Sequence, residues 1–169
     1  MSWRLVAMCA CAALLASACA RVNPVSRLSP DGSSRIYSVA ALDFEAPADW
    51  RADGSGRQVK LVSPGGDALL EVRATAVPGP AATCLSGAEE ALARGASSLD
   101  GVRRHPSTFA GRKAVVQEAD QGGWHGWAWA TCDGGEQYRV WISGRAPVSR
   151  QTIDAQKRLV ATARLGGSP

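Results

Sequence analysis

The chain has 169 residues with a formal net charge of +4, and 46% of its residues are hydrophobic. This length suits a single domain with one hydrophobic core. The basic residues are scattered rather than clustered, which argues against a nucleic-acid-binding protein.

The first segment, MSWRLVAMCACAALLASACA, has the pattern of an export signal. Arg4 supplies a positive charge, and the apolar stretch at residues 5–15 is too short to cross a bilayer as a helix. The closing LASAC resembles the lipobox of bacterial lipoproteins. The resemblance implies that residues 1–18 are a signal peptide and that Cys19 is acylated, becomes the new N-terminus and anchors the protein to the membrane.

The residues around Cys19 also bear on the destination of the protein. Ala20 follows the cysteine where aspartate would signal retention, so the resemblance implies the outer membrane of the bacterial envelope, with the domain facing the periplasm. Ordinary secretion is the alternative, because Ala16-Ser17-Ala18 and Ala18-Cys19-Ala20 both satisfy the small-x-small rule for cleavage.

Residues 19–34 are polar and interrupted by Pro24 and Pro30. They have too few apolar residues to pack, so they predict a flexible tether between the lipid and the domain. Residues 35–166 are then the globular domain. Three large apolar residues near its start are expected to be buried anchors: Ile36, Phe44 and Trp50.

The strand patterns of the domain are short and separated by glycine-rich turns. Residues 57–63 and 67–77 show an imperfect alternation of apolar and polar side chains around a PGGD turn, which predicts a β-hairpin. A short segment at residues 102–109 comes later in the chain. Three more strand patterns follow it as an antiparallel meander with Gly-Gly turns: residues 111–120, 124–132 and 136–143.

Two helices complete the pattern. Apolar residues recur every three or four positions from Cys84 to Leu99, and Ser86 with Glu89 has the spacing of a capping box. The same periodicity predicts a closing helix over residues 149–163. The fold class is therefore α+β, with one largely antiparallel sheet of about six strands and helices packed against it.

Several stretches resemble the PsbP-like superfamily, which includes PsbP and Ran-binding Mog proteins. They are YSVAALDFEAPADW, FAGRKAVV, a Trp/Tyr strand pair and a final helix with ATARL, within residues 36–165. The resemblance implies an α-β-α sandwich and a non-catalytic accessory or binding role, here as an envelope lipoprotein. Those roles differ among members, so no functional residue is carried over.

Cys84 and Cys132 are the thiols that remain when Cys9 and Cys11 leave with the signal and Cys19 takes the lipid. Two thiols in an oxidising compartment usually pair, so we predict a structural disulfide between them. The chain-entropy model gives a loop of this length about 4 kcal/mol of stabilisation.

The segment QGGWHGWAWATCDGGEQYRVWISG contains four of the six tryptophans. A two-residue turn at Gly134-Gly135 would place Trp129 opposite Val140 and put the aromatic residues in the core. A three-residue turn that includes Asp133 would shift the register by one and place Trp129 opposite Arg139.

We predict the second register, because it directs Cys132 to the side of the helix that follows Cys84. That register gathers one candidate face for a ligand or partner: His125, Trp127, Trp129, Arg139 and Trp141. Exposed, such a face would suit stacking on sugar rings or apolar peptide, and covered, it would be core.

Sequence motifs for catalysis are absent, including G-x-S-x-G, H-E-x-x-H and a phosphate loop. His105 and His125 lack the spacing of a metal site, and the adjacent Glu89 and Glu90 point to different sides of a helix. We therefore expect no enzyme, no cofactor and no metal.

The expected function is a binding or accessory module for another envelope protein. A small-ligand module for glycan or lipid is the alternative, and a hydrolase is a distant one.

Overall fold

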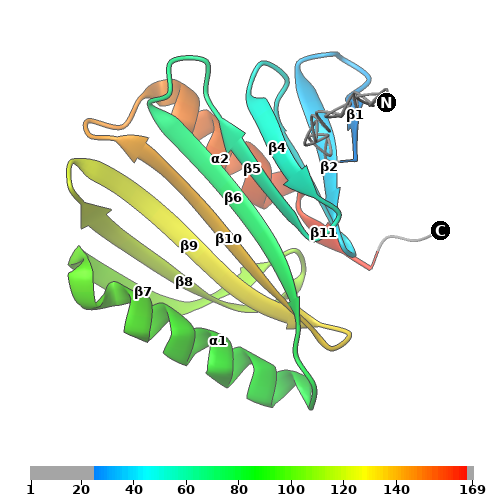
Figure 1. Cartoon of the computed structure of the whole chain (residues 1–169), viewed down its shortest axis with the longest axis vertical. Helices are drawn as coiled ribbons and strands as arrows, with labels where there is room; N and C mark the ends of the chain where they lie inside the picture. Colours follow the sequence, from blue (N-terminus) through cyan, green and yellow to red (C-terminus); the bar gives the residue numbers. More distant parts are fainter. Residues whose placement is uncertain (1–24, 167–169) are drawn as a thin grey trace, which may run out of the picture.

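The computed structural model describes residues 25–166, in which eleven strands form two sheets and two α-helices pack against them (Figure 1). The small sheet has the strand order β1 (Ser26–Leu28), β2 (Ser34–Val39), β3 (Leu42–Pro47) and β11 (Arg164–Leu165). The large sheet has the order β4 (Arg51–Ser55), β5 (Gln58–Val62), β6 (Ala68–Ala76), β10 (Glu136–Arg145), β9 (Trp124–Asp133), β8 (Arg112–Gln121) and β7 (Asp100–Phe109). The strand pairs of both sheets are antiparallel.

The two helices lie on opposite faces of the large sheet. Helix α1 (Ala81–Gly95), which is followed by the 3-10 turn Ala96–Ser98, lies in front of the sheet in Figure 1, and α2 (Arg150–Thr162) lies behind it. We call the face toward α2 and the small sheet the inner face, and the face toward α1 the outer face. Within residues 25–166, neither helix combines the length and the apolar composition needed to cross a membrane.

The main core lies on the inner face, because alternate residues of the central strands point there. Six of them are 0–1% exposed: Val59, Leu61, Leu70, Val72, Val140 and Ile142. Of the predicted anchors, Phe44 and Trp50 are buried, whereas Ile36 is only half-buried because its neighbours Tyr37 and Val39 take the inward positions of β2.

The α+β class and the hairpins are confirmed, but the sheet content is larger than predicted. A single sheet of about six strands is wrong, because β4 and the small sheet add strands too short to show periodicity, and the segment at 102–109 is the ten-residue edge strand β7.

The signal peptide at residues 1–18 and the acylation site Cys19 lie outside the described residues, and so does the first part of the predicted tether 19–34. The rest of that range is ordered, since β1 pairs with β2 and Ser34 is fully buried. In the turn between them, the Asp31 carboxylate accepts hydrogen bonds from Ser29 and Ser33. These bonds hold the pKa of Asp31 at about 2 and fix a turn that lacks apolar residues.

The second helix begins where it was predicted, whereas the first helix begins earlier than predicted. Helix α2 follows Ser149, whose Oγ accepts the Thr152 N–H, so its predicted start is confirmed. Helix α1 begins at Ala81 after Pro80, and the predicted capping box is wrong, because Ser86 lies inside the helix and its Oγ donates to the Ala82 carbonyl.

Candidate functional site

The turn between β9 and β10 decides which side chains reach which face. Gly134 has φ of 55° and Gly135 has φ of 81°, the backbone of a two-residue type I′ turn. Cys132 consequently pairs with Gln137 and Trp129 pairs with Val140. The predicted three-residue register is wrong, because both glycines adopt the left-handed conformation and Asp133 remains in the strand.

This register splits the predicted face into two groups. His125, Trp127 and Trp129 project from the inner side of β9, where Trp129 is 5% exposed and contacts Phe109 with ring centroids 5.9 Å apart. Arg139 and Trp141 alternate with the buried Val140 and therefore project from the outer side of β10.

The disulfide between Cys84 and Cys132 is present and joins α1 to β9. Cys132 lies on the outer face with Gly126, Ala128 and Ala130, so small side chains let α1 approach that strand closely. The disulfide requires only that Cys132 face the helix, which holds in either register. It could not discriminate between the two registers.

His125 belongs to a polar cluster where β8 ends and β9 begins. Its Nδ1 lies 2.7 Å from an Asp120 oxygen, and its Nε2 lies 3.1 Å from a Glu118 oxygen that also accepts a hydrogen bond from Arg103. The imidazole also packs edge-on against Trp127. The carboxylates come from the neighbouring strand, so spacing along the chain could not reveal them. In residues 25–166 no group of three metal-binding side chains gathers.

His105 lies apart from this cluster, exposed on the edge strand β7 opposite Val116. Neither histidine lines the outer-face hollows described next.

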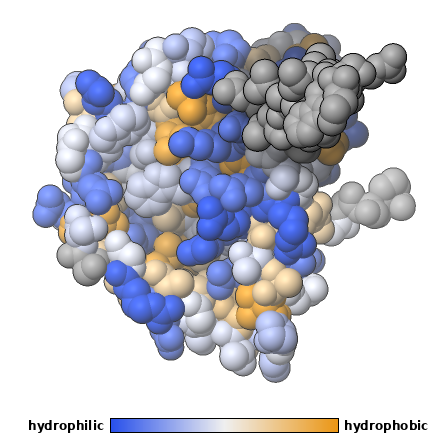
Figure 2. All heavy atoms as spheres, in the orientation of Figure 1, coloured by the Kyte–Doolittle hydropathy of each residue, from blue (hydrophilic) through white to orange (hydrophobic). Residues whose placement is uncertain are grey.

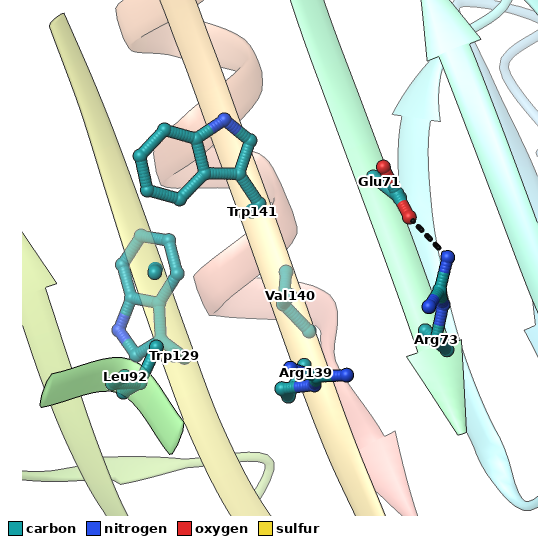
Figure 3. A pocket seen from close by; sticks show the side chains of 8 residues that line it. Glu71, Arg73, Leu92, Trp129, Arg139, Val140 and Trp141 are labelled. Atoms are coloured by element: carbon teal, nitrogen blue, oxygen red, sulfur yellow. Dashed lines mark hydrogen bonds and ion pairs between the residues drawn. The ribbon is translucent and has the colours of Figure 1, made fainter. Parts of the chain in front are cut away.

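The outer face contains a pocket of about 240 Å³ where α1 leaves the sheet uncovered. The residues around it come from four elements: Glu71 and Arg73 of β6, Ala128 and Trp129 of β9, Arg139, Val140 and Trp141 of β10, and Leu92 of α1 (Figure 3). Seen from the same side as Figure 1, strongly hydrophilic side chains cross the middle of this face, with hydrophobic ones on either side (Figure 2). The pocket is therefore amphipathic rather than a piece of uncovered core.

The indole of Trp141 lies flat on the sheet and extends from β10 toward β9 (Figure 3). A Cβ atom at Gly126 would be 2.6 Å from Cζ2 of this indole, a distance that real Cβ atoms do not reach. Gly126 thus permits the close approach of the ring to the backbone. One side of the half-buried indole rests on the sheet. The other side faces solvent and lines both this pocket and a second hollow next to it.

The charges in the pocket do not balance. Arg139 is directly opposite Arg73 on the neighbouring strand, and both project from the outer face. Arg73 donates to Glu71 at 3.2 Å, and Glu71 also accepts a hydrogen bond from Gln58. Arg139 is half-buried and makes no ion pair or hydrogen bond with the side chains in the described part of the chain. Two cations and one anion leave the pocket positive.

A second hollow of about 230 Å³ begins on the other side of Trp141. Its lining is uncharged and includes Trp124, Gln121 and Ser143. The guanidinium of Arg145 lies 5.9 Å from the centre of the Trp124 ring. The outer face therefore carries two adjoining hollows, each with a tryptophan, and only the first is charged.

Comparison with solved structures identifies the fold as PsbP-like. Cyanobacterial PsbP (CyanoP) from Synechocystis sp. PCC 6803 matches with a TM-score of 0.56 at 14% identity, over 79% of this chain and 93% of that one. A crystal structure from Bacteroides thetaiotaomicron VPI-5482 matches with a TM-score of 0.50 at 12% identity, over 86% and 50% of the two chains. LpqN, involved in cell envelope biogenesis of Mycobacterium tuberculosis, has a TM-score of 0.47 at 15% identity, over 83% and 89%.

No protein-family model and no curated protein sequence matches the chain. At these identities the structural likeness establishes the fold and assigns no site. The predicted PsbP-like architecture is confirmed on the match to CyanoP.

Proposed function

We propose that the protein is a non-catalytic, lipid-anchored module of the bacterial cell envelope that binds another envelope component through its outer face. The observation that carries this proposal is the pocket beside Trp141, which combines an open aromatic surface with an unpaired arginine. Sites of this kind, concave and partly apolar with a few polar groups, are the usual places where proteins bind ligands and partners.

The cellular part of the proposal depends on the N-terminal sequence. The export signal and the LASAC stretch support acylation at Cys19 and attachment to the outer membrane on the periplasmic side. A PsbP-like fold supports an accessory or binding role, as the resemblance implies. Mass spectrometry of membrane-extracted protein should find an acylated Cys19, and an unmodified N-terminus would contradict the anchor.

A small-ligand module is a second candidate, and the size of the pocket favours it. About 240 Å³ lies below the range of about 300–1,000 Å³ that is usual for drug-sized ligands, and it suits one ring or one small side chain. The two candidates share the same site, so one experiment tests both.

That experiment places a photo-crosslinking benzophenone amino acid at Lys60, which is exposed and pairs with Glu71 on the outer face. The matched control carries the same amino acid at Lys157, which is exposed on α2. In intact cells we expect a crosslinked envelope component from position 60 and none from position 157. Equal capture at both positions, or none at either, would contradict a binding role for the outer face.

A further inference from the structure

We infer that the outer-face pocket binds a sugar ring that carries a carboxylate, within an acidic oligosaccharide. This inference rests on the proposed function and names the chemistry of its partner. Three properties of the pocket support it: the uncompensated arginine, the flat tryptophan and the uncharged hollow that adjoins them.

The first property calls for an anion. Like charges directly opposite on neighbouring strands destabilise a sheet, and a half-buried guanidinium without a partner loses hydration without compensation. Glu71 is already engaged with Arg73 and Gln58, which leaves Arg139 uncompensated. A ligand carboxylate beside Arg139 would supply the missing partner, because its planar pair of oxygens matches the fork of a guanidinium.

The second property calls for a flat, partly apolar ring beside that anion. Trp141 is two residues from Arg139 on the same face, a separation of about 7 Å along a strand. This spacing matches a six-membered sugar ring whose carboxylate reaches Arg139 while its C–H face stacks on the indole. Glu71 pairs with Trp141 across the strands, so its carboxylate is placed to accept hydrogen bonds from ring hydroxyls.

The third property indicates more than one ring. The second hollow continues past Trp141, has no charged side chain in its lining and contains Trp124 and the polar Gln121 and Ser143. Its composition suits a neutral sugar next to the acidic one. An acidic peptide would satisfy Arg139 equally well, but it has no need of two flat aromatic surfaces in series, so we favour the glycan.

Binding is tested by tryptophan fluorescence and calorimetry with three defined probes. The hyaluronan tetrasaccharide alternates glucuronic acid with N-acetylglucosamine, chitotetraose contains N-acetylglucosamine alone, and tetraglutamate carries carboxylates without sugar rings. We expect the hyaluronan tetrasaccharide to bind at least about tenfold more tightly than either of the others, because only it satisfies both the arginine and the tryptophan.

Variants assign the binding to the pocket. Arg139→Met and Trp141→Ala should each raise the dissociation constant about tenfold or more, whereas Arg139→Lys and Trp141→Phe should retain part of the affinity. Arg150→Met is the matched control, because it removes the same charge from an exposed position at the start of α2. It should leave the dissociation constant within about twofold of the parent.

Three outcomes would overturn the inference: equal binding of chitotetraose, tighter binding of tetraglutamate, or no binding of any probe. If the crosslinker at Lys60 still captures an envelope component in those cases, the inference fails and the proposed function stands. If position 60 captures nothing, the proposed function fails independently of the sugar probes.

Discussion

The inner and outer faces of the large sheet are made by the same strands but have different tasks. On β10, Val140 and Ile142 point inward and are 0–1% exposed, whereas Arg139 and Trp141 point outward and are half-buried. On β9, Trp129 is core, and Gly126 on the other face is the floor under Trp141. A tryptophan is therefore structural or available for binding according to its parity in the strand, and its residue type alone does not decide the matter.

The two faces also differ in the interactions that hold the packed helices and the small sheet against them. The inner face is covered by α2 and the small sheet through a continuous cluster of buried side chains. The outer face is covered only in part by α1, whose described side chains include just two buried ones, Cys84 and Ala88. Cys84 is half of the disulfide, so a covalent bond replaces much of the packing on that face.

The largest effect is expected from tryptophan deletion on the two faces. Trp129→Ala should lower the free energy of unfolding by about 3–5 kcal/mol, because it opens a cavity beside Phe109 in the core. Trp141→Ala, the matched change on the outer face, should cost less than about 1.5 kcal/mol, because its ring is half-exposed. Urea unfolding measures both values. Equal losses would show that the outer face is as much a part of the core as the inner face.

The disulfide should give the next largest effect. Replacing both Cys84 and Cys132 with serine should lower the free energy of unfolding by about 2–4 kcal/mol, because the residues are 48 positions apart and the crosslink restricts the unfolded chain. Amide hydrogen exchange should accelerate in α1 far more than in α2. A uniform acceleration in both helices would show that α1 does not depend on the disulfide for its position.

Much of this fold is readable in the sequence, because the relevant signals are local. The alternation in residues 57–77, the glycine turns and the helical period after Cys84 predict elements that the structure contains. The pairing of Cys84 with Cys132 followed from the count of thiols. The sequence did not predict that β1 is an ordered strand. The turn after β1 depends on the hydrogen bonds of Asp31 with Ser29 and Ser33 rather than on apolar residues.

The candidate site was less predictable, because it depends on register and on contacts between strands. Asp133-Gly134-Gly135 is compatible with either turn length, and the choice between them moves Arg139 and Trp141 to a different set of neighbours. Arg73 and Glu71 are far from Arg139 in sequence and become its neighbours only through the pairing of β6 with β10. The sequence signal for the candidate site was Gly126 in the middle of a strand pattern, because its missing side chain accommodates Trp141.

A medium effect is expected from the turn that sets the register. Gly134→Val should lower the free energy of unfolding by about 1–2 kcal/mol, because a branched L-residue is strained at a φ of 55°. Gly134→Asn is the matched control and should be nearly neutral, since asparagine suits the first position of a type I′ turn. No atom lies within 4 Å of a Cβ at this position, so crowding cannot explain a difference. Equal stability of the two variants in urea would argue against the two-residue turn.

The smallest expected effect concerns the two buried tyrosines of the inner core. Their titration should leave the free energy of unfolding unchanged at neutral pH and change it only at alkaline pH. Burial raises the pKa of Tyr37 and Tyr138 above the ordinary value of about 10. The folded protein therefore keeps protons that the unfolded chain releases, so the free energy of unfolding should be unaffected by these groups below about pH 10 and should fall above it.

Urea unfolding across this pH range separates the faces once more. Each phenol can contribute a slope of at most about 1.4 kcal/mol per pH unit, so Tyr37→Phe should remove up to half of the alkaline loss that the tyrosines cause. Trp141→Ala should keep the full slope of the parent, because it alters only the outer face. A reduced slope in Trp141→Ala would mean that the two faces are energetically coupled through β10, and the separation of core from binding surface would then be incomplete.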